Sequence, residues 1–330
     1  MNGAAAWAEL LEDNGEAAAG EDFFRSRPFL DAEGVTHTLR IATGEAELLA
    51  PLIVREIDDG PERDAISPYG YPGLVVASEI DHTGGGSIPD ARVDPAQVDF
   101  SEAGLVSIFI RHRLDAAPLA GASERNIVQI ADPSLPPKSR PSDRNQINKN
   151  LRRGYRAHVV PGPQTSAAER AGFLAAYEQT MRRTGAAARY FFGAAYFDRI
   201  LESEQSWLAL AVDPDGEVAA ASIAVGSDGL LHYYLSGSAD AALRDSPMKN
   251  VLAALIQLSA ELELPLNLGG GIAPGDRLEE FKRGFANREQ AWLTSEVVCD
   301  ASAYERLSAG RDASGFFPAY RVSVGPPRRP

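Results

Sequence analysis

The chain has 330 residues, of which 44% are hydrophobic, and its length allows one large or two medium domains with a real core. Its 32 basic residues face 46 acidic ones, and the net charge of −14 argues against a protein that coats nucleic acid or anionic membrane over its whole surface. The single cysteine, Cys299, excludes an intramolecular disulfide and a cysteine zinc site.

The N-terminal residues contain no basic segment followed by an apolar core, so we expect no signal peptide. No stretch reaches the roughly 18 apolar residues that cross a bilayer. We therefore expect a cytoplasmic protein that does not bind membranes and that is a monomer. Residues 1–28 are predicted to be an N-terminal extension, and the alanine-rich first twenty residues favour a short helix.

Residues 29–143 are predicted to form a first domain that ends in a linker. Apolar runs of strand length, bounded by turn residues, occur at 36–44, 46–57, 73–80, 104–114 and 125–132. Four prolines in residues 133–143 then predict the linker between two domains.

Residues 144–330 are predicted to form a second domain. Helices are expected near 144–153, at 165–186 and at 194–203, and strands at 206–213, 217–226 and 229–238. The turn Asp213–Gly216 is a hairpin signal between the first two strands. A helix at 246–263, a strand at 264–271, a helix at 276–285 and a strand at 290–300 complete the order. This order matches an N-acyltransferase domain of the GNAT type, in which one strand splays from its neighbour to open a slot for the acyl donor.

Several motifs in this order resemble the Fem-type aminoacyl transferases and their acyltransferase relatives. They are SPYGYPG (67–73), YFFGAAYFDRIL (190–201), YYLSGS (233–238), LGGG, FKRGF, YERL and FFPAYR. The resemblance runs from about Phe29 to Arg321. It implies a mixed α+β fold of two tandem GNAT-like domains, each a mostly antiparallel sheet flanked by helices. It also implies transfer of an aminoacyl group from a charged tRNA to an amine, to form an amide.

The more distant relatives use acyl-CoA, so the donor must be weighed from the sequence. GNAT enzymes that use CoA hold its pyrophosphate on backbone N–H groups of a glycine-containing loop that opens a helix. At that place the chain has residues 239–251, which contain no glycine and two acids, Asp240 and Asp245. We therefore favour aminoacyl-tRNA as co-substrate and expect no cofactor.

A local basic segment offers a place for tRNA despite the acidic composition. Between Lys138 and Arg156, seven basic residues oppose one acid, Asp143. The predicted tRNA-binding residues are Lys149, Arg152, Arg153 and Arg156. The alternative is a solvated helix face beside a linker.

Attack of an amine on an aminoacyl ester needs stabilisation of the negative tetrahedral oxygen and a proton for the leaving ribose hydroxyl. Lys282 in FKRGF is the predicted cation, because the resembling family assigns such a role to the lysine of its "FK" motif. Tyr234 and Tyr233 are further catalytic candidates on the strand that would line the slot, and strand alternation sends them to opposite faces. Asp143 and Asp64 are possible general bases, but the sequence shows no supporting partner for either.

The remaining candidates are predicted to bind substrate. Fem enzymes use an arginine and a tyrosine near the end of the long helix to hold an anionic acceptor. The predicted substrate-binding residues are Arg183, Tyr190, Tyr196, Tyr69, Phe281, Gly270 and Gly271. Each has an ordinary structural alternative as a core aromatic, a helix-end cation or a turn glycine.

Five scattered histidines and one cysteine predict no metal site. The preferred function is therefore a tRNA-dependent aminoacyl transferase that acts on a peptide or small-molecule amine. That amine belongs to an antibiotic or other secondary metabolite, or to a peptidoglycan precursor. The alternatives are an acyl-CoA-dependent N-acyltransferase of the same fold and a non-catalytic GNAT-like binding module.

Overall fold

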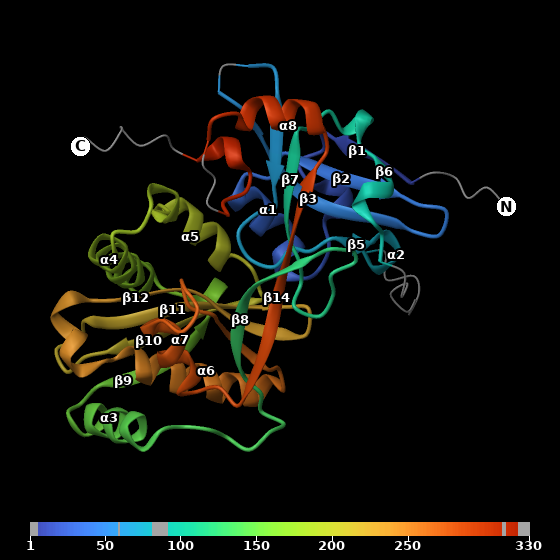
Figure 1. Ribbon diagram of the computed structural model, residues 1–330. Helices are drawn as coiled ribbons and strands as arrows, with labels where there is room; N and C mark the ends of the chain where they lie inside the picture. Colours follow the sequence, from blue (N-terminus) through green and yellow to red (C-terminus); the bar gives the residue numbers. More distant parts are fainter. Residues whose placement is uncertain (1–5, 59, 81–91, 312–314, 323–330) are drawn as a thin grey trace. The chain divides into compact units, whose positions relative to one another are not determined.

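The computed structural model describes residues 6–58, 60–80, 92–311 and 315–322. The chain forms two compact units (Figure 1). The first contains the chain as far as Arg125 and again from Trp292, and the second is the continuous segment Asn126–Ala291. These bounds differ from the expected domains at 29–143 and 144–330. The reason is that β8 (Ser123–Ala131) runs into the second unit and β14 (Arg288–Val298) returns to the first.

The sheet of the first unit has the strand order β6-β1-β2-β3-β4-β7-β14. Its strands before β14 are β1 (Ala6–Leu11), β2 (His37–Ala42), β3 (Glu47–Glu56), β4 (Arg63–Ile66), β6 (Val98–Asp99) and β7 (Ser107–Arg111). β1 pairs antiparallel with β2 and buries Ala8 completely. The expected N-terminal helix is therefore wrong for residues 6–11, which belong to the first sheet, because cross-strand pairing overrides the helix propensity of alanine.

The helices of the first unit are short. They are α1 (Arg27–Glu33), α2 (Ala77–Ile80) and α8 (Ala301–Ser308). The strand expected at 73–80 is reduced to β5 (Val75–Val76), which pairs with β3, and α2 follows it directly.

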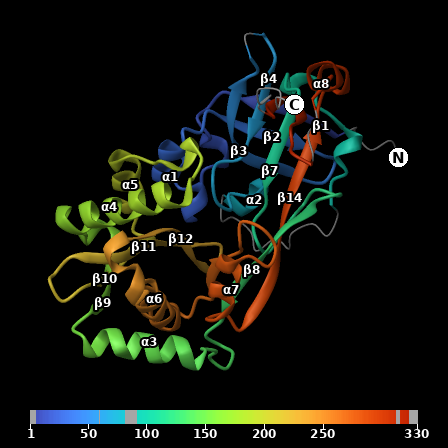
Figure 2. The same cartoon turned by 60° about the vertical axis from the view of Figure 1, so that its left-hand side comes forward.

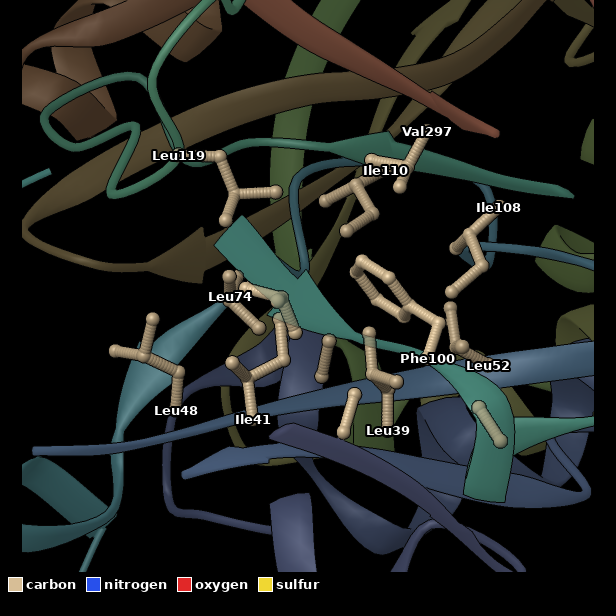
Figure 3. Close-up of a cluster of buried hydrophobic side chains, with 14 of the residues drawn as sticks. Leu39, Ile41, Leu48, Leu52, Leu74, Phe100, Ile108, Ile110, Leu119 and Val297 are labelled. Atoms are coloured by element: carbon tan, nitrogen blue, oxygen red, sulfur yellow. The ribbon is translucent and has the colours of Figure 1, made fainter. Parts of the chain in front are cut away.

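Apolar side chains from several strands make the core of the first unit (Figure 3). Alternation along β2, β3 and β7 sends their apolar side chains to one face of the sheet, and Leu74, Phe100 and Leu119 from outside the named strands complete the cluster. Figure 3 labels Leu39, Ile41, Leu48, Leu52, Leu74, Phe100, Ile108, Ile110, Leu119 and Val297. Each large side chain of this kind contributes about 1.5–3 kcal/mol when fully buried. Val297 of β14 joins a core made otherwise by residues before Arg125, so the chain after Trp292 is integral to this unit.

The sheet of the second unit has the order β8-β13-β12-β11-β10-β9. Its remaining strands are β9 (Arg156–Pro161), β10 (Ser206–Val212), β11 (Val218–Ser227), β12 (Leu230–Ser238) and β13 (Leu266–Gly269). Each unit has four antiparallel strands in succession, then a parallel pair, then an antiparallel last strand. The parallel pairs in this repeat are β4 with β7 and β12 with β13, and the first unit adds β6 as an outer strand parallel to β1. This repeat confirms the predicted α+β class with two GNAT-like halves.

Helices cover both faces of the second sheet (Figures 1 and 2). α4 (Ala167–Thr184) and α5 (Ala194–Leu201) lie on one face, and α6 (Met248–Leu262) lies on the other with α3 (Pro141–Arg152) beside it. Ser166 and Glu169 form a capping box that begins α4, which ends at Gly185. α4 approaches β12 so closely that a side chain at Gly237 would collide with the helix backbone. The predicted linker is shorter than expected, because α3 begins at Pro141.

Candidate active site

The parallel pair of the second unit is short. β12 and β13 pair only at Leu231↔Leu266 and His232↔Asn267. β13 keeps its other neighbour, β8, as far as Gly269↔Gln129, and β12 continues to Ser238. The two strands therefore separate after His232↔Asn267, a place that we call the fork. The splayed strand expected from the sequence is present here.

Side chains hold the last pair before the fork. Asn267 Nδ2 lies 3.0 Å from His232 Nδ1, and Asn267 Oδ1 accepts a hydrogen bond from Gly269 N at 2.8 Å. The imidazole therefore carries its proton on Nε2, which lies 3.3 Å from Ser227 O. Burial lowers the pKa of His232 to about 4. His232 is a neutral, fully engaged ring that fixes the fork, and its geometry suits a structural role rather than that of a base.

A β-bulge separates the two tyrosines. The register between β11 and β12 shifts between Ile223 and Ala224, so Tyr234 is the extra residue between paired Tyr233 and Leu235. Tyr233 packs against the core under α6, and its hydroxyl donates to Ser236 Oγ at 2.5 Å. The Tyr234 hydroxyl lies 2.8 Å from that of Tyr196 on α5. The two rings thus serve opposite faces, as strand alternation predicted.

Lys282 lies at the fork. It belongs to α7 (Arg277–Arg283), whose N-cap Asp276 accepts from Glu279 N. Its Nζ donates to Gly270 O at 2.7 Å and lies 5.8 Å from the centre of the Tyr233 ring. The residue is 8% exposed, and in the described part of the chain it has no ion-pair partner. Burial lowers its pKa to about 8, partly opposed by the carboxylate of Asp276.

This environment suits a Lys282 ammonium group that pairs with a negatively charged substrate group. Burial without a carboxylate makes the ammonium form of Lys282 less favourable than it is in water, and a developing oxyanion or a phosphate would relieve that cost. The tyrosine face contributes a weak attraction for the cation.

The glycines at 269–271 bring backbone close to this amine. A side chain at Gly269, whose φ is +75°, would approach Lys282 Nζ to 3.1 Å. One at Gly270 would lie 2.5 Å from the Asn126 amide, and Asn126 Nδ2 itself donates to Gly271 O at 2.8 Å. Gly270 and Gly271 therefore form a wall against Lys282, with their carbonyls held by side chains.

The start of α6 is where a GNAT enzyme would hold a pyrophosphate. Here a short 3-10 helix, Asp240–Asp245, precedes α6. Asp245 forms an ion pair with Arg153 and accepts from Tyr155 OH at 3.0 Å. Its backbone oxygen accepts from Asn150 at 2.8 Å. A fixed carboxylate thus stands before the α6 N-terminus, where an anionic ligand would otherwise be favoured.

The other predicted site residues are dispersed. Arg183 forms an ion pair with Asp240 and donates to Ser238 O at 3.3 Å. The backbone oxygen of Tyr190 accepts from Tyr177 OH at 2.6 Å, and the guanidinium of Arg189 covers the Tyr190 ring. These contacts place both residues at the α4 and α5 face with Tyr196, away from the face that carries Lys282.

Phe281 and Tyr69 stand apart from that group. The Phe281 ring meets Phe285 edge-on at 5.7 Å and packs on the core under α6. Tyr69 belongs to the first unit, where its backbone N donates to Glu33.

The predicted tRNA-binding residues are exposed on α3 and at the start of β9. Lys149, Arg152 and Arg156 face solvent, whereas Arg153 is engaged with Asp245. Of the acids considered as bases, Asp143 pairs with Lys249 at 2.9 Å, and buried Asp64 is held by Arg55 and Arg321. Both carboxylates serve to join elements of structure.

Three polar residues near the fork are not among the site residues predicted from the sequence: Asn126, Gln129 and Asn267. Asn126 and Gln129 lie on β8, which was predicted as an ordinary strand of the first domain. The polar residues in the otherwise apolar run 125–132 were a signal, but their neighbour β13 is more than 130 residues away in the sequence.

Comparison with known proteins agrees with this geometry. Residues 140–283 match the family model of the acetyltransferase (GNAT) domain. Among solved structures, FemX has a TM-score of 0.59 at 10% identity, over 90% of this chain and 99% of that one. A C-terminal DUF2156 domain from Agrobacterium fabrum has a TM-score of 0.55 at 14% identity, over 88% and 92%. L-PGS from Bacillus licheniformis has a TM-score of 0.53 at 14% identity, over 82% and 86%.

A search of curated protein sequences found no match. The family match at residues 140–283 and the fork both agree with a GNAT-type acyltransferase fold for the second unit. The chain as a whole has the fold of the Fem-type structures, as its motifs predicted. No helix in the described ranges is long and apolar enough to cross a membrane.

Proposed function

We propose that this acyltransferase takes an aminoacyl group from aminoacyl-tRNA and joins it through an amide bond to the amine of a peptide or small molecule. The observation that carries the proposal is Lys282, a buried amine without a carboxylate partner among the described residues, placed at the fork where a GNAT fold receives its acyl donor. The likeness to FemX in fold and the sequence motifs support the choice of donor.

In the proposed reaction, the lone pair of a neutral acceptor amine attacks the ester carbonyl. The carbonyl oxygen becomes an oxyanion, which the Lys282 ammonium stabilises. Collapse breaks the bond to the ribose oxygen, which leaves with the proton that the amine gives up. The Gly270 carbonyl and the Tyr233 ring hold the Lys282 ammonium in place before substrate arrives.

Two features support tRNA over acyl-CoA. Asp245 occupies the approach to the α6 N-terminus, so a pyrophosphate would meet a carboxylate there. Exposed Lys149, Arg152 and Arg156 offer a local positive field to an RNA backbone. The ion pair of Arg153 with Asp245 lowers the negative charge at that site, so the argument rests on occupied space more than on net charge.

The acceptor in this proposal lacks a diphosphate. Arg183, the best sequence match to a diphosphate grip, is engaged by Asp240 and by Ser238 O. This favours a peptide or secondary-metabolite amine over a nucleotide-linked peptidoglycan precursor.

The test is transfer of label from a pool of labelled aminoacyl-tRNA to a panel of amines, with RNase added to a parallel tube. We expect transfer that RNase abolishes, and the amino acid transferred identifies the donor. Transfer from acetyl-CoA in the absence of RNA would instead establish the second candidate, an acyl-CoA N-acyltransferase. That candidate is favoured by the GNAT family match at 140–283. Tight binding of a partner with no transfer to any amine would establish a binding module.

A further inference from the structure

Gln129 is a buried polar residue beside the fork that the mechanism above does not use. It lies on β8 directly opposite Gly269, and it is 0% exposed. Ala131, two residues along the same strand, belongs to the core under α6, so Gln129 points to that same face. A side chain added at Gly269 would reach to 3.1 Å from Lys282 Nζ. Gln129 therefore lies next to the glycine that borders the lysine.

The amide of Gln129 has a defined orientation. Its Nε2 donates to Glu289 Oε1 at 3.1 Å. A flipped amide would turn its oxygen toward that carboxylate, where two acceptors would repel each other, so the neighbouring charge fixes which end is nitrogen. Arg283 of α7 binds the same Glu289 oxygen at 3.3 Å and holds the carboxylate in position.

With this orientation, Oε1 is left as a buried acceptor. In the described ranges it has no hydrogen-bond partner. Buried polar atoms are nearly always paired, so an orphaned oxygen beside a proposed reaction centre points to a donor that arrives with a ligand. The Glu289 carboxylate also polarises the amide and strengthens Oε1 as an acceptor, which suits an amine or an ammonium group.

We propose that Gln129 Oε1 accepts a hydrogen bond from the α-amino group of the aminoacyl donor. The inference rests on the proposed function and deepens it, because it names the group that separates an aminoacyl donor from a plain acyl donor. The α-nitrogen is two bonds from the ester carbonyl, so a carbonyl oxygen held by Lys282 brings the amine into the neighbourhood of Gln129. Gly269, which pairs with Gln129 across the strands, leaves the approach to Lys282 Nζ without a side chain. Gln129 is thus a specificity-determining residue.

The experiment compares two donors on the same tRNA: the amino acid that the pool assay identifies, and its desamino analogue, with hydrogen in place of the α-amino group. The measured quantity is the ratio of kcat/KM values for the two donors. Wild type should favour the aminoacyl donor. Gln129→Met, which keeps the volume and removes the acceptor, should lower that ratio at least ten-fold, mainly by reducing transfer of the aminoacyl donor. Comparison of ratios between variants cancels the intrinsic difference in ester reactivity.

Two further variants complete the design. Gln257→Met removes an exposed amide on α6 that bonds only Glu261 among the described residues, and should leave the ratio unchanged. Glu289 is exposed, and Glu289→Gln removes the carboxylate that fixes the orientation of the Gln129 amide. This variant should lower the ratio by a smaller factor than Gln129→Met does. It also tests the proposal should Gln129→Met fail to fold.

The outcomes separate the two proposals. Transfer of the aminoacyl group with the same ratio in wild type, Gln129→Met and Glu289→Gln overturns the role of Gln129 and leaves the aminoacyl transferase standing. Absence of any transfer from tRNA overturns both.

Discussion

The two units contain the same parallel strand pair in two different states. In the first unit β4 and β7 pair at Ala65↔Ile108 and Ile66↔Phe109. Backbone bonds extend this junction on both sides, from Val106 N to Arg63 O at 2.8 Å and from Ser67 N to Phe109 O at 2.9 Å. The side-chain oxygen of Ser67 then accepts from Arg111 N at 3.0 Å.

In the second unit the matching pair is extended on one side only among the described residues, by the bond from Leu231 N to Pro265 O at 3.0 Å, and it ends at His232↔Asn267 on the other. Beyond this point β12 has the bulge at Tyr234, β13 ends in glycines, and Lys282 Nζ donates to the backbone oxygen of Gly270. The same strand topology is therefore present in both units, but only the second has the open fork that the proposed donor site needs. A donor site requires that the ladder be stopped and that the freed backbone be satisfied by side chains such as Asn267 and Asn126.

The largest expected effect concerns the closed junction. Asp64 of β4 is 0% exposed and accepts from Arg55 at 2.8 Å and from Arg321 at 2.9 Å. Asp64→Ala leaves the half-buried guanidinium groups of Arg55 and Arg321 without their carboxylate and should lower the free energy of unfolding by about 1–3 kcal/mol. Urea denaturation measures this loss. Exposed Asp215→Ala is the control and should change stability by less than about 0.5 kcal/mol.

If the first unit only supports the structure and contributes no catalytic residue, the folded molecules of Asp64→Ala should have the same kcat as wild type. A catalytic defect greater than the loss of folded protein would place chemistry at Asp64 and would break the comparison.

The second effect concerns the open fork. Lys282→Ala removes the proposed oxyanion partner and should lower kcat at least about ten-fold, equivalent to roughly 1.4 kcal/mol of transition-state stabilisation. Steady-state kinetics with the identified donor and amine measure the change. Arg277→Ala, an exposed cation on the same helix, is the matched control. A near-normal rate for Lys282→Ala would remove the lysine from the mechanism.

The third prediction compares Gly269→Ala with Gly229→Ala, to separate the effect of backbone strain on stability from the effect of a displaced Lys282 on turnover. Gly269 and Gly229 have similar left-handed backbones, with φ of +75° and +70°. An alanine meets Lys282 Nζ at Gly269 and nothing within 4 Å at Gly229. Each Gly→Ala variant should lose about 1–2 kcal/mol of stability. Only Gly269→Ala should also lose turnover, by up to about ten-fold. Equal kinetics for the two variants would show that the contact with Lys282 is irrelevant.

The smallest effect is a pH dependence. Burial lowers the pKa of Lys282 from 10.5 to about 8, so kcat should fall as pH rises through about 8 and the ammonium is lost.

The free energy of unfolding should change in the opposite direction and rise with pH. The unfolded state binds more protons between pH 8 and 10.5, so wild type should gain stability relative to Lys282→Met across that window. In Lys282→Arg, any remaining activity should lack the limb near pH 8. A wild-type profile that stays flat to pH 9.5 would contradict a protonated lysine.

Much of the second unit could be predicted from the sequence. The order of strands and helices, the hairpin at Asp213–Gly216 and the opposite faces of Tyr233 and Tyr234 follow from local periodicity and turn chemistry. The approach of Lys282 to the glycine run follows from their short separation along the chain.

The rest depends on long-range pairing. Residues 6–11 favour a helix locally but pair with β2, and β8 joins β13 across more than 130 residues. Long separation along the sequence also made the ion pairs of Arg153 and Arg183 impossible to predict. Both are predicted as ligand-binding cations, and both are engaged by acids far away in the sequence: Asp245 is 92 residues from Arg153, and Asp240 is 57 residues from Arg183. The sequence shows which residues are charged, but their ion-pair partners depend on the three-dimensional fold.

The most direct test is a crystal structure with an uncleavable mimic of the charged tRNA end, 3′-aminoacylamino-3′-deoxyadenosine. We expect its amide carbonyl or a neighbouring polar atom to lie within hydrogen-bond distance of Lys282 Nζ, between the ends of β12 and β13. Coenzyme A bound at that place, with Lys282 turned into solvent, would contradict it.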